Sequence, residues 1–223
     1  MKAVNRTKDA RNREQAGKRP SGAHEKLDNN PAAREAKLEL RRRVLAEVTP
    51  ARVFDAFCGR GEMYRGVWKE GATDYVGCDE RPWHRDDPPR FVADNTRLMR
   101  AIDLGRFNVF DFDAYGSPWD QALILAARRK WQPGEKGALV LTDGSAFSLG
   151  WTHIPPGMRE LAGLATKIGP STKSHVADLM DMARRGWAKR SHVTILAMWQ
   201  AAVKTGAEVV YTALVFEGQK SEA

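Results

Sequence analysis

The sequence is poor in the residues that build disulfide scaffolds and metal sites. It has two cysteines, Cys58 and Cys78, and five scattered histidines that share no ligand spacing. A disulfide framework or a zinc site requires more such residues at regular intervals. We therefore predict neither a disulfide nor a metal site, and we expect a reducing compartment.

Long apolar runs are also absent. No run approaches the ~18 residues of a membrane span, and the charged N-terminus is not followed by the apolar segment of a signal peptide. We therefore expect a cytoplasmic protein without a membrane partner, and no oligomeric state is predicted. The 223 residues suffice for one substantial α/β domain plus a tail.

Positive charge is concentrated near the N-terminus. The net charge is +8, and residues 1–43 hold 13 Lys or Arg against 6 Asp or Glu. Residues 1–30 show no periodicity and predict a basic arm that is disordered in isolation. Such an arm gains affinity for phosphate by releasing counterions, which favours a nucleic acid partner. A tail that only improves solubility is the alternative.

Residues 31–49 predict an entry helix to the domain. Asn30 and Pro31 are typical of an N-cap followed by proline in the first turn, and Thr49-Pro50 marks the end of the pattern. This helix carries three consecutive arginines. We expect Arg41, Arg42 and Arg43 to bind nucleic acid phosphate.

After residue 50, short β-rich runs alternate with segments long enough for helices. This alternation predicts an α/β fold with a mostly parallel, doubly wound sheet. The predicted strands are 52–57, 74–78, 90–93, 108–112, 138–141 and 208–216, and the predicted helices are 62–70, 97–102, 118–130, 174–187 and 189–204. Residues 144–174 are rich in Gly and Pro and too long for an ordinary connection, so we expect an insertion or lid there.

The stretch RFNVFDFDAYGSPWD contains the candidate catalytic residues. The apolar run predicts a buried strand that ends at Asp113, Ala114 and Tyr115, and open α/β sheets bind ligands at that edge. The Asp113 carboxylate and the Ala114 carbonyl can each accept a hydrogen bond from an amine, and the Tyr115 ring can stack on a base. A strand followed by an ordinary Asx-turn is the alternative. Aromatic or imidazole rings of the insertion, at Phe147, Trp151 and His153, are expected either to help hold the base or to pack in the core.

The stretch DAFCGRG, residues 55–61, predicts a cofactor loop after the first strand. Its acid and two glycines are similar to motif I of S-adenosylmethionine-dependent methyltransferases. Glycines at these positions let a ligand approach the backbone closely. The second strand ends in Asp79 and Glu80, where nucleotide folds bind ribose hydroxyls. The third ends in Asp94 and Asn95, where a carboxylate can accept the adenine amino group or cap a helix. The loop residues assigned to the cofactor are Asp55, Ala56, Phe57, Gly59 and Gly61.

Four stretches together resemble the tRNA (guanine-26-N2)-dimethyltransferase family: VFDAFCGRG, VADNTRLM, FDFDAYGSPWDQA and LVLTDGSAFSLG. DFDAYGSP matches its D-x-D-P-F-G-S-P catalytic motif, with Ala114 in place of the usual proline. The resemblance spans residues 50–150 and implies a Rossmann-like class I methyltransferase domain over residues 31–223, as a small variant without the family's C-terminal domain. It implies that Asp113 holds the target amine. Asp111, two residues earlier in the same motif, is assigned to cofactor binding.

The expected function is methyl transfer from S-adenosylmethionine to an exocyclic amine of a nucleobase, with guanine N2 in RNA, and tRNA in particular, favoured. DAFCGRG is also similar to the D-P-F-x-G-x-G of amino-methylating DNA methyltransferases, so DNA adenine or cytosine is an alternative. Two further alternatives are a small-molecule methyltransferase and a non-catalytic nucleic-acid-binding protein on a methyltransferase fold.

Overall fold

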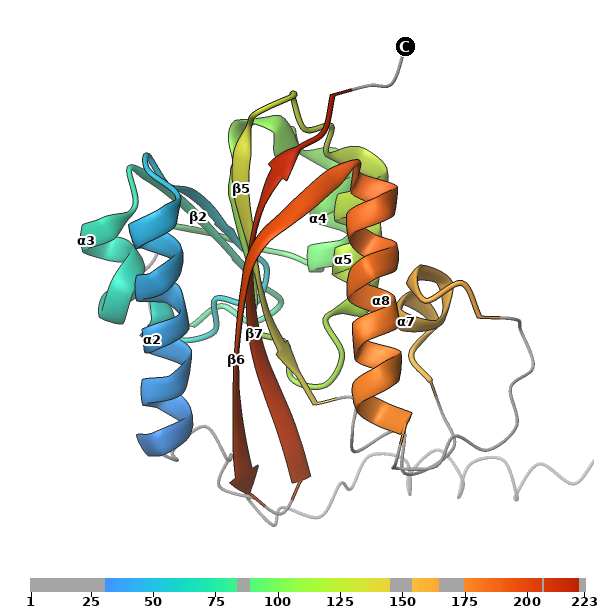
Figure 1. Ribbon diagram of the computed structural model, residues 1–223. Helices are drawn as coiled ribbons and strands as arrows, with labels where there is room; N and C mark the ends of the chain where they lie inside the picture. The colour runs from blue at the N-terminus through green and yellow to red at the C-terminus, as the bar shows by residue number, and fades with distance from the viewer. Residues whose placement is uncertain (1–30, 84–88, 145–153, 165–174, 206, 221–223) are drawn as a thin grey trace, which may run out of the picture. The chain divides into compact units, whose positions relative to one another are not determined.

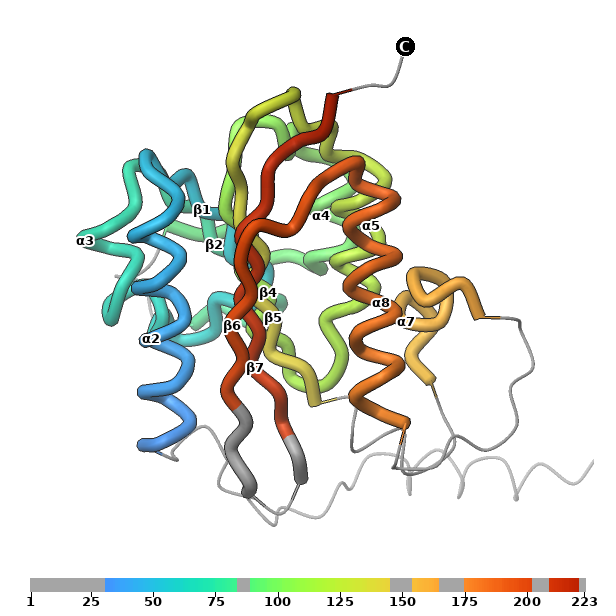
Figure 2. Tube along the Cα trace, viewed as in Figure 1, coloured from blue at the N-terminus to red at the C-terminus, as the bar shows by residue number. Residues whose placement is uncertain are grey.

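A computed structural model describes residues 31–83, 89–144, 154–164, 175–205 and 207–220. Residues Pro31–Ala223 form one compact unit, distinct from Met1–Asn30. The predicted basic arm therefore lies outside the described residues. The path of the chain through the compact unit is traced in Figure 2.

The described residues form a seven-stranded sheet in the order β3-β2-β1-β4-β5-β7-β6 (Figure 1). Strands β1 to β5 pair in parallel, while β7 runs antiparallel to both β5 and β6. The predicted mostly parallel sheet is therefore confirmed. The strands are β1 (Arg52–Asp55), β2 (Asp74–Asp79), β3 (Arg90–Val92), β4 (Val109–Phe112), β5 (Lys136–Asp143), β6 (Val193–Thr205) and β7 (Ala207–Gly218).

Helices cover both faces of the sheet, which confirms the doubly wound prediction (Figure 1). Helix α2 (Pro31–Glu47) packs on one face with the π-helix η2 (Tyr64–Trp68) and α3 (Lys69–Gly71). Helices α4 (Asn95–Ala101), α5 (Trp119–Arg128) and α8 (Val176–Ser191) belong to the opposite face. A 3-10 turn, η3 (Leu104–Arg106), precedes β4, and α7 (Pro156–Leu161) packs against α5 and α8.

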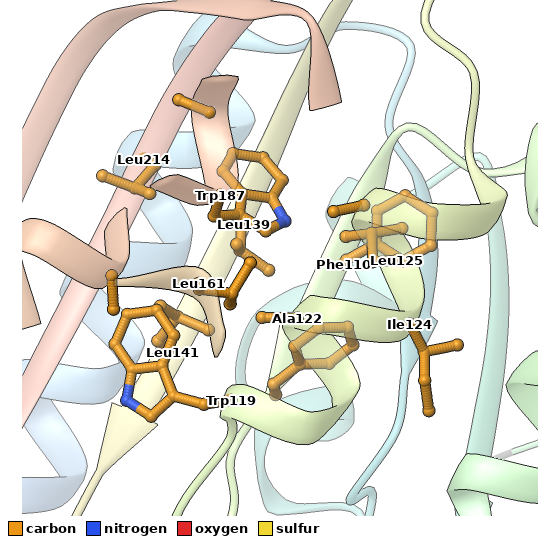
Figure 3. Close-up of a cluster of buried hydrophobic side chains, with 14 of the residues drawn as sticks. Phe110, Trp119, Ala122, Ile124, Leu125, Leu139, Leu141, Leu161, Trp187 and Leu214 are labelled. Atoms are coloured by element: carbon orange, nitrogen blue, oxygen red, sulfur yellow. The ribbon is translucent and has the colours of Figure 1, made fainter. Parts of the chain in front are cut away.

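Strand β4 separates two hydrophobic clusters because its side chains alternate between the faces. Phe110 and Phe112 belong to the larger cluster, on the side of α5 and α8. Phe110 is labelled there among its neighbours in Figure 3. Val109 belongs to the smaller cluster, on the side of α2. The side chain of Asp111 points to the same face as Val109. Because of this alternation, Asp111 and Asp113 both face helix α2. Trp119 is 1% exposed and part of the larger cluster, as a core role predicts.

The predicted helix at 189–204 is wrong. Helix α8 continues to Ser191 and ends at His192, which adopts a left-handed conformation with φ 55° and ψ 49°. The chain then forms β6, which pairs with β7 along its length. Leu, Ala, Met and Gln favour helices locally, but pairing with β7 outweighs that weak preference. The final strand, predicted at 208–216, is confirmed as β7.

The predicted insertion at 144–174 is described only in part. Helix α7 lies within it, while Phe147, Trp151 and His153 lie outside the described residues, as do 165–174. Whether this segment is a lid stays a prediction. None of the helices in the described ranges has the length and apolar character needed to cross a bilayer.

Candidate active site

The glycine loop follows β1 and is shaped by backbone conformations that favour glycine. Gly59 has φ 49° and Gly61 has φ 79°, a region where a side chain is strained. The loop is fixed at its start by two hydrogen bonds: the Ala56 amide donates to the Asp111 carbonyl at 3.0 Å, and the Cys58 amide donates to the Cys78 carbonyl at 3.0 Å. The loop therefore lies at the carboxyl ends of β1, β2 and β4.

Asp79, predicted to bind ribose, supports this loop. Its Oδ2 accepts a hydrogen bond from the Gly59 amide at 3.0 Å, and its Oδ1 accepts one from the Arg81 amide at 2.9 Å. Each carboxylate oxygen has a second lone pair, so the hydrogen bonds leave acceptor capacity for a ligand. Glu80 is exposed to solvent.

The end of β3 contributes a linked set of polar side chains. Asp94 caps α4, because its Oδ1 accepts from the Arg97 amide at 2.8 Å and from the Thr96 hydroxyl at 2.6 Å. Those hydrogen bonds lower the pKa of Asp94. Asn95 donates to the Ala56 carbonyl at 3.0 Å and accepts from Gln121 Nε2 at 2.9 Å. Asp94 thus has the helix-cap role that was its alternative reading, and Asn95 is tied to the loop.

Gln121 is a site residue that the sequence did not reveal. It lies on α5, is 7% exposed, and its Oε1 has no hydrogen-bond partner among the described residues. A buried acceptor without a donor is costly, so this atom marks a place where a ligand donor would be stabilised. The glutamine in SPWDQA carried no signal beyond its position near the motif.

Asp55 lies beneath the loop rather than on its surface. It is 2% exposed, its Oδ1 accepts from the Phe57 amide at 3.0 Å, and its Oδ2 accepts from the Tyr75 hydroxyl at 2.8 Å. Burial, together with the nearby charge of Asp111, raises the pKa of Asp55 well above its usual value. The side chain of Asp55 therefore stabilises the turn, and a direct contact with a cofactor is not supported for it.

The segment from Asp113 to Gly116 forms the turn after β4. Ala114 is buried, whereas the Tyr115 ring is 87% exposed. Gly116 has φ 118°, and its carbonyl accepts from the Gly144 amide at 2.7 Å, which ties the turn to the end of β5. An exposed tyrosine on a fixed turn is available for stacking, as the predicted role requires.

Asp113 faces helix α2, where Lys37 approaches both of its oxygens. Lys37 Nζ donates to Oδ2 at 3.0 Å and lies 2.8 Å from Oδ1, and the two side chains are 15% and 14% exposed. Burial alone would raise the pKa of Asp113, but the charges of Lys37 and Arg41 and the hydrogen bond from Lys37 lower it. Asp113 is therefore ionised at neutral pH, as an acceptor for an amine must be.

Arg41 and Asp111 form a buried ion pair, which corrects both predictions. Arg41 Nε donates to Asp111 Oδ2 at 2.7 Å and Nη2 donates to Oδ1 at 2.5 Å, with side chains 1% and 0% exposed. Trp68 Nε1 also donates to Asp111 Oδ2, at 2.8 Å. Arg41 is thus buried rather than on the surface to bind phosphate, and the Asp111 carboxylate is enclosed by protein donors. Together they hold α2 against β4.

Arg42 and Arg43 lie on the solvent side of α2, with side chains 47% and 49% exposed. Arg42 pairs with Glu35 at 2.7 Å, and Arg43 pairs with Glu39 at 3.0 Å. Exposed pairs of this kind are weak, so phosphate can compete for both guanidinium groups. The helix therefore divides the predicted arginine cluster into one buried and two exposed residues.

No protein-family model matches the chain, and no curated protein sequence matches it. Solved structures do resemble it. One is the N-methyltransferase NodS from Bradyrhizobium japonicum WM9 in complex with S-adenosyl-L-homocysteine, at 13% identity and TM-score 0.53, covering 95% of this chain and 98% of that one. TYW2 of M. jannaschii, in complex with AdoMet, has 11% identity and TM-score 0.52, covering 82% of this chain and 77% of that one.

Trm1 from Pyrococcus horikoshii, in complex with S-adenosyl-L-methionine, is also similar. The identity is 17% and the TM-score 0.52, covering 83% of this chain and 56% of that one. At these identities the comparisons concern the fold. The chain has the Rossmann-like fold of these methyltransferases.

Proposed function

We propose that the chain is an S-adenosylmethionine-dependent methyltransferase that acts on an exocyclic amine of a nucleobase. The observation that carries this proposal is the pairing of an ionised, half-enclosed Asp113 with the exposed Tyr115 ring at the carboxyl end of β4. The glycine loop lies at the same end of the sheet. The fold, shared with proteins whose structures hold this cofactor or its product, supports the assignment.

The residues around the loop fit this cofactor. Gly59 and Gly61 have no side chain, so a ligand can approach their backbone closely. Asp79 retains acceptor capacity for ribose hydroxyls. The Oε1 of Gln121, which has no hydrogen-bond partner among the described residues, could accept from the amino group of an adenine. When bound, S-adenosylmethionine supplies an electrophilic methyl group on a sulfonium. We assign its binding to the backbone of residues 56–61 and to Asp79, Glu80, Asp94, Asn95 and Gln121.

The protein contributes to this reaction by positioning the amine and by stabilising charge. The lone pair of an aromatic amine is delocalised into its ring, so the amine is a weak nucleophile. The Asp113 carboxylate and the Ala114 carbonyl each accept a hydrogen bond from one of its two N–H groups, and the lone pair is thereby turned away from both oxygens. The ring stacks on Tyr115. When bound, the cofactor would supply the methyl group, and the Asp113 carboxylate would stabilise the positive charge that develops on the amine nitrogen.

A nucleobase within a duplex cannot reach this turn, so the target is unpaired or flipped out, at a cost of a few kcal/mol. Guanine N2 in RNA is the first candidate, because DFDAYGSP is the most specific motif and resembles that of the tRNA (guanine-26-N2)-dimethyltransferase family. The basic residues 1–43, including the exposed Arg42 and Arg43, supply the charge for a nucleic acid. DNA adenine or cytosine is the second candidate, favoured by DAFCGRG.

The test is transfer of labelled methyl from S-adenosylmethionine to RNA and, separately, to DNA, followed by identification of the methylated nucleoside by mass. Methylguanosine from RNA supports the first candidate, and a methylated amino group in DNA supports the second. Cofactor binding without transfer to either would leave only a binding role, and the proposal would be wrong.

Asp113→Asn sharpens this test. We expect transfer to fall about 10²- to 10³-fold, the effect of losing one electrostatic stabiliser, while calorimetry shows nearly unchanged cofactor affinity. Asp103→Asn is the matched control, since Asp103 is an exposed cap residue of η3 and asparagine preserves that cap. Full activity in Asp113→Asn would remove Asp113 from the mechanism.

A further inference from the structure

Lys37 and Asp113 place a donor and an acceptor side by side at the proposed acceptor site. Lys37 Nζ lies 3.0 Å from Oδ2 and 2.8 Å from Oδ1. The two groups come from α2 and from the turn after β4, 76 residues apart in sequence. Neither group is withdrawn from solvent completely, since the side chains are 15% and 14% exposed.

Both groups retain hydrogen-bonding capacity. An ammonium has three N–H donors, and within the described residues one of them makes a hydrogen bond, to Asp113 Oδ2. Asp113 Oδ1 is buried and makes no hydrogen bond of good geometry among those residues, although the Lys37 charge is near it. A ligand that offers one donor and one neighbouring acceptor would satisfy both groups together.

The surroundings hold Lys37 in this position. Its ammonium lies 5.6 Å from the centroid of the Tyr211 ring, within reach of a cation–π attraction. Arg41, one helical turn later, anchors α2 to β4 through Asp111. Arg41 also lies 3.8 Å from Asp113 Oδ2, so the carboxylate has a second positive neighbour. Lys37 is thus held in place by its neighbours and is not a mobile surface lysine.

A neutral amine alone is a poor competitor for a carboxylate that already has an ammonium partner. A nucleobase offers more than an amine, because each amino-bearing base has a ring nitrogen acceptor next to the amino group. In guanine this atom is N3 beside the N2 amine, in adenine N1 beside the N6 amine, and in cytosine N3 beside the N4 amine. An alkylamine has no such neighbour.

We infer that Lys37 is a specificity-determining residue that donates to the ring nitrogen adjacent to the amine held by Asp113. This inference rests on the proposed function and deepens it. Asp113 then accepts from the amine, and Lys37 donates to the ring nitrogen on the same edge of the base. The Lys37 ammonium keeps its contact with the Asp113 carboxylate. Amines that lack the neighbouring acceptor are rejected because they leave a half-buried ammonium without its second partner.

The experiment compares the base that the wild-type enzyme methylates with its deaza analogue, in which the ring nitrogen next to the amine is replaced by C–H. For guanine the analogue is 3-deazaguanine, placed in the same oligonucleotide. We expect wild type to prefer the natural base by about 10- to 100-fold in kcat/KM, the loss expected when a charged donor has no acceptor. In Lys37→Met we expect lower activity on the natural base and a preference near 1.

Lys69→Met is the matched control, because Lys69 is exposed on α3, and it should keep the wild-type preference. Equal activity of wild type on both bases would overturn the inference without any variant, so it stays testable even if Lys37→Met does not fold. A preference unchanged in Lys37→Met would overturn it too. Faster transfer by Lys37→Met would show that Lys37 blocks the site instead. No transfer by wild type to any nucleic acid would refute the proposed function itself.

Discussion

Replacing Arg41 by methionine tests whether the buried ion pair holds the active-site face of the sheet together. Arg41 is 1% exposed and Asp111 is 0% exposed, and two hydrogen bonds join them. Methionine has an unbranched apolar side chain that can follow the path of the arginine stem, but it has no charge. Asp111 would retain the hydrogen bond from Trp68 Nε1, at 2.8 Å, and would lose its cation.

The expected loss of unfolding free energy is about 3–5 kcal/mol, the cost of leaving one member of a buried pair uncompensated. That is a large share of the roughly 5–15 kcal/mol that stabilises a domain. Most of the loss arises from the stranded carboxylate, so removing its charge should restore stability. The double variant Arg41→Met/Asp111→Asn should therefore be more stable than Arg41→Met alone, because asparagine can still accept from Trp68.

Urea denaturation of wild type, both single variants and the double variant measures this coupling, provided that the m-value stays constant. Arg43→Met is the control, since Arg43 is 49% exposed and pairs with Glu39 in solvent; it should change stability by less than about 1 kcal/mol. A loss below about 1 kcal/mol in Arg41→Met, or a double variant no more stable than it, would refute this reasoning.

Two further predictions concern pH and packing. The pKa of Asp113 is lowered from 3.8 and that of Lys37 is raised from 10.5, so the pair stabilises the fold between these values. The difference in unfolding free energy between wild type and Lys37→Met should shrink as pH falls below 3.8 or rises above 10.5. Denaturant midpoints at acid, neutral and alkaline pH measure this difference, and a difference that stays constant would contradict the prediction. Gly186→Ala should lower the melting temperature, although alanine favours helices, because its Cβ would lie 1.7 Å from the Leu161 carbonyl oxygen. We expect a loss of about 1–3 kcal/mol, and an unchanged melting temperature would show that α7 can shift.

The features that depend on neighbouring residues could be predicted from the amino-acid sequence. Alternating apolar runs and turn residues were enough to predict the parallel strands, since a buried strand needs a continuous apolar run. The glycine loop was also predictable, because its backbone has positive φ at Gly59 and Gly61. The turn after β4 followed from the same local chemistry. The helix predicted at 189–204 failed because β6 is held by non-local pairing with β7.

The partner that each charged side chain faces depends on how distant segments pack, so it could not be predicted from the sequence. Lys37 and Arg41 are four residues apart and so share one face of α2, but the sequence does not say that Asp111 and Asp113 meet this face. Packing buries Arg41 on Asp111 and sets Lys37 against Asp113, across 70 and 76 residues of sequence. Arg42 and Arg43, identical in chemistry to Arg41, stay exposed because the helix turns them away from the sheet. Burial, rather than residue type, therefore separates the groups that build the site from those available to a partner.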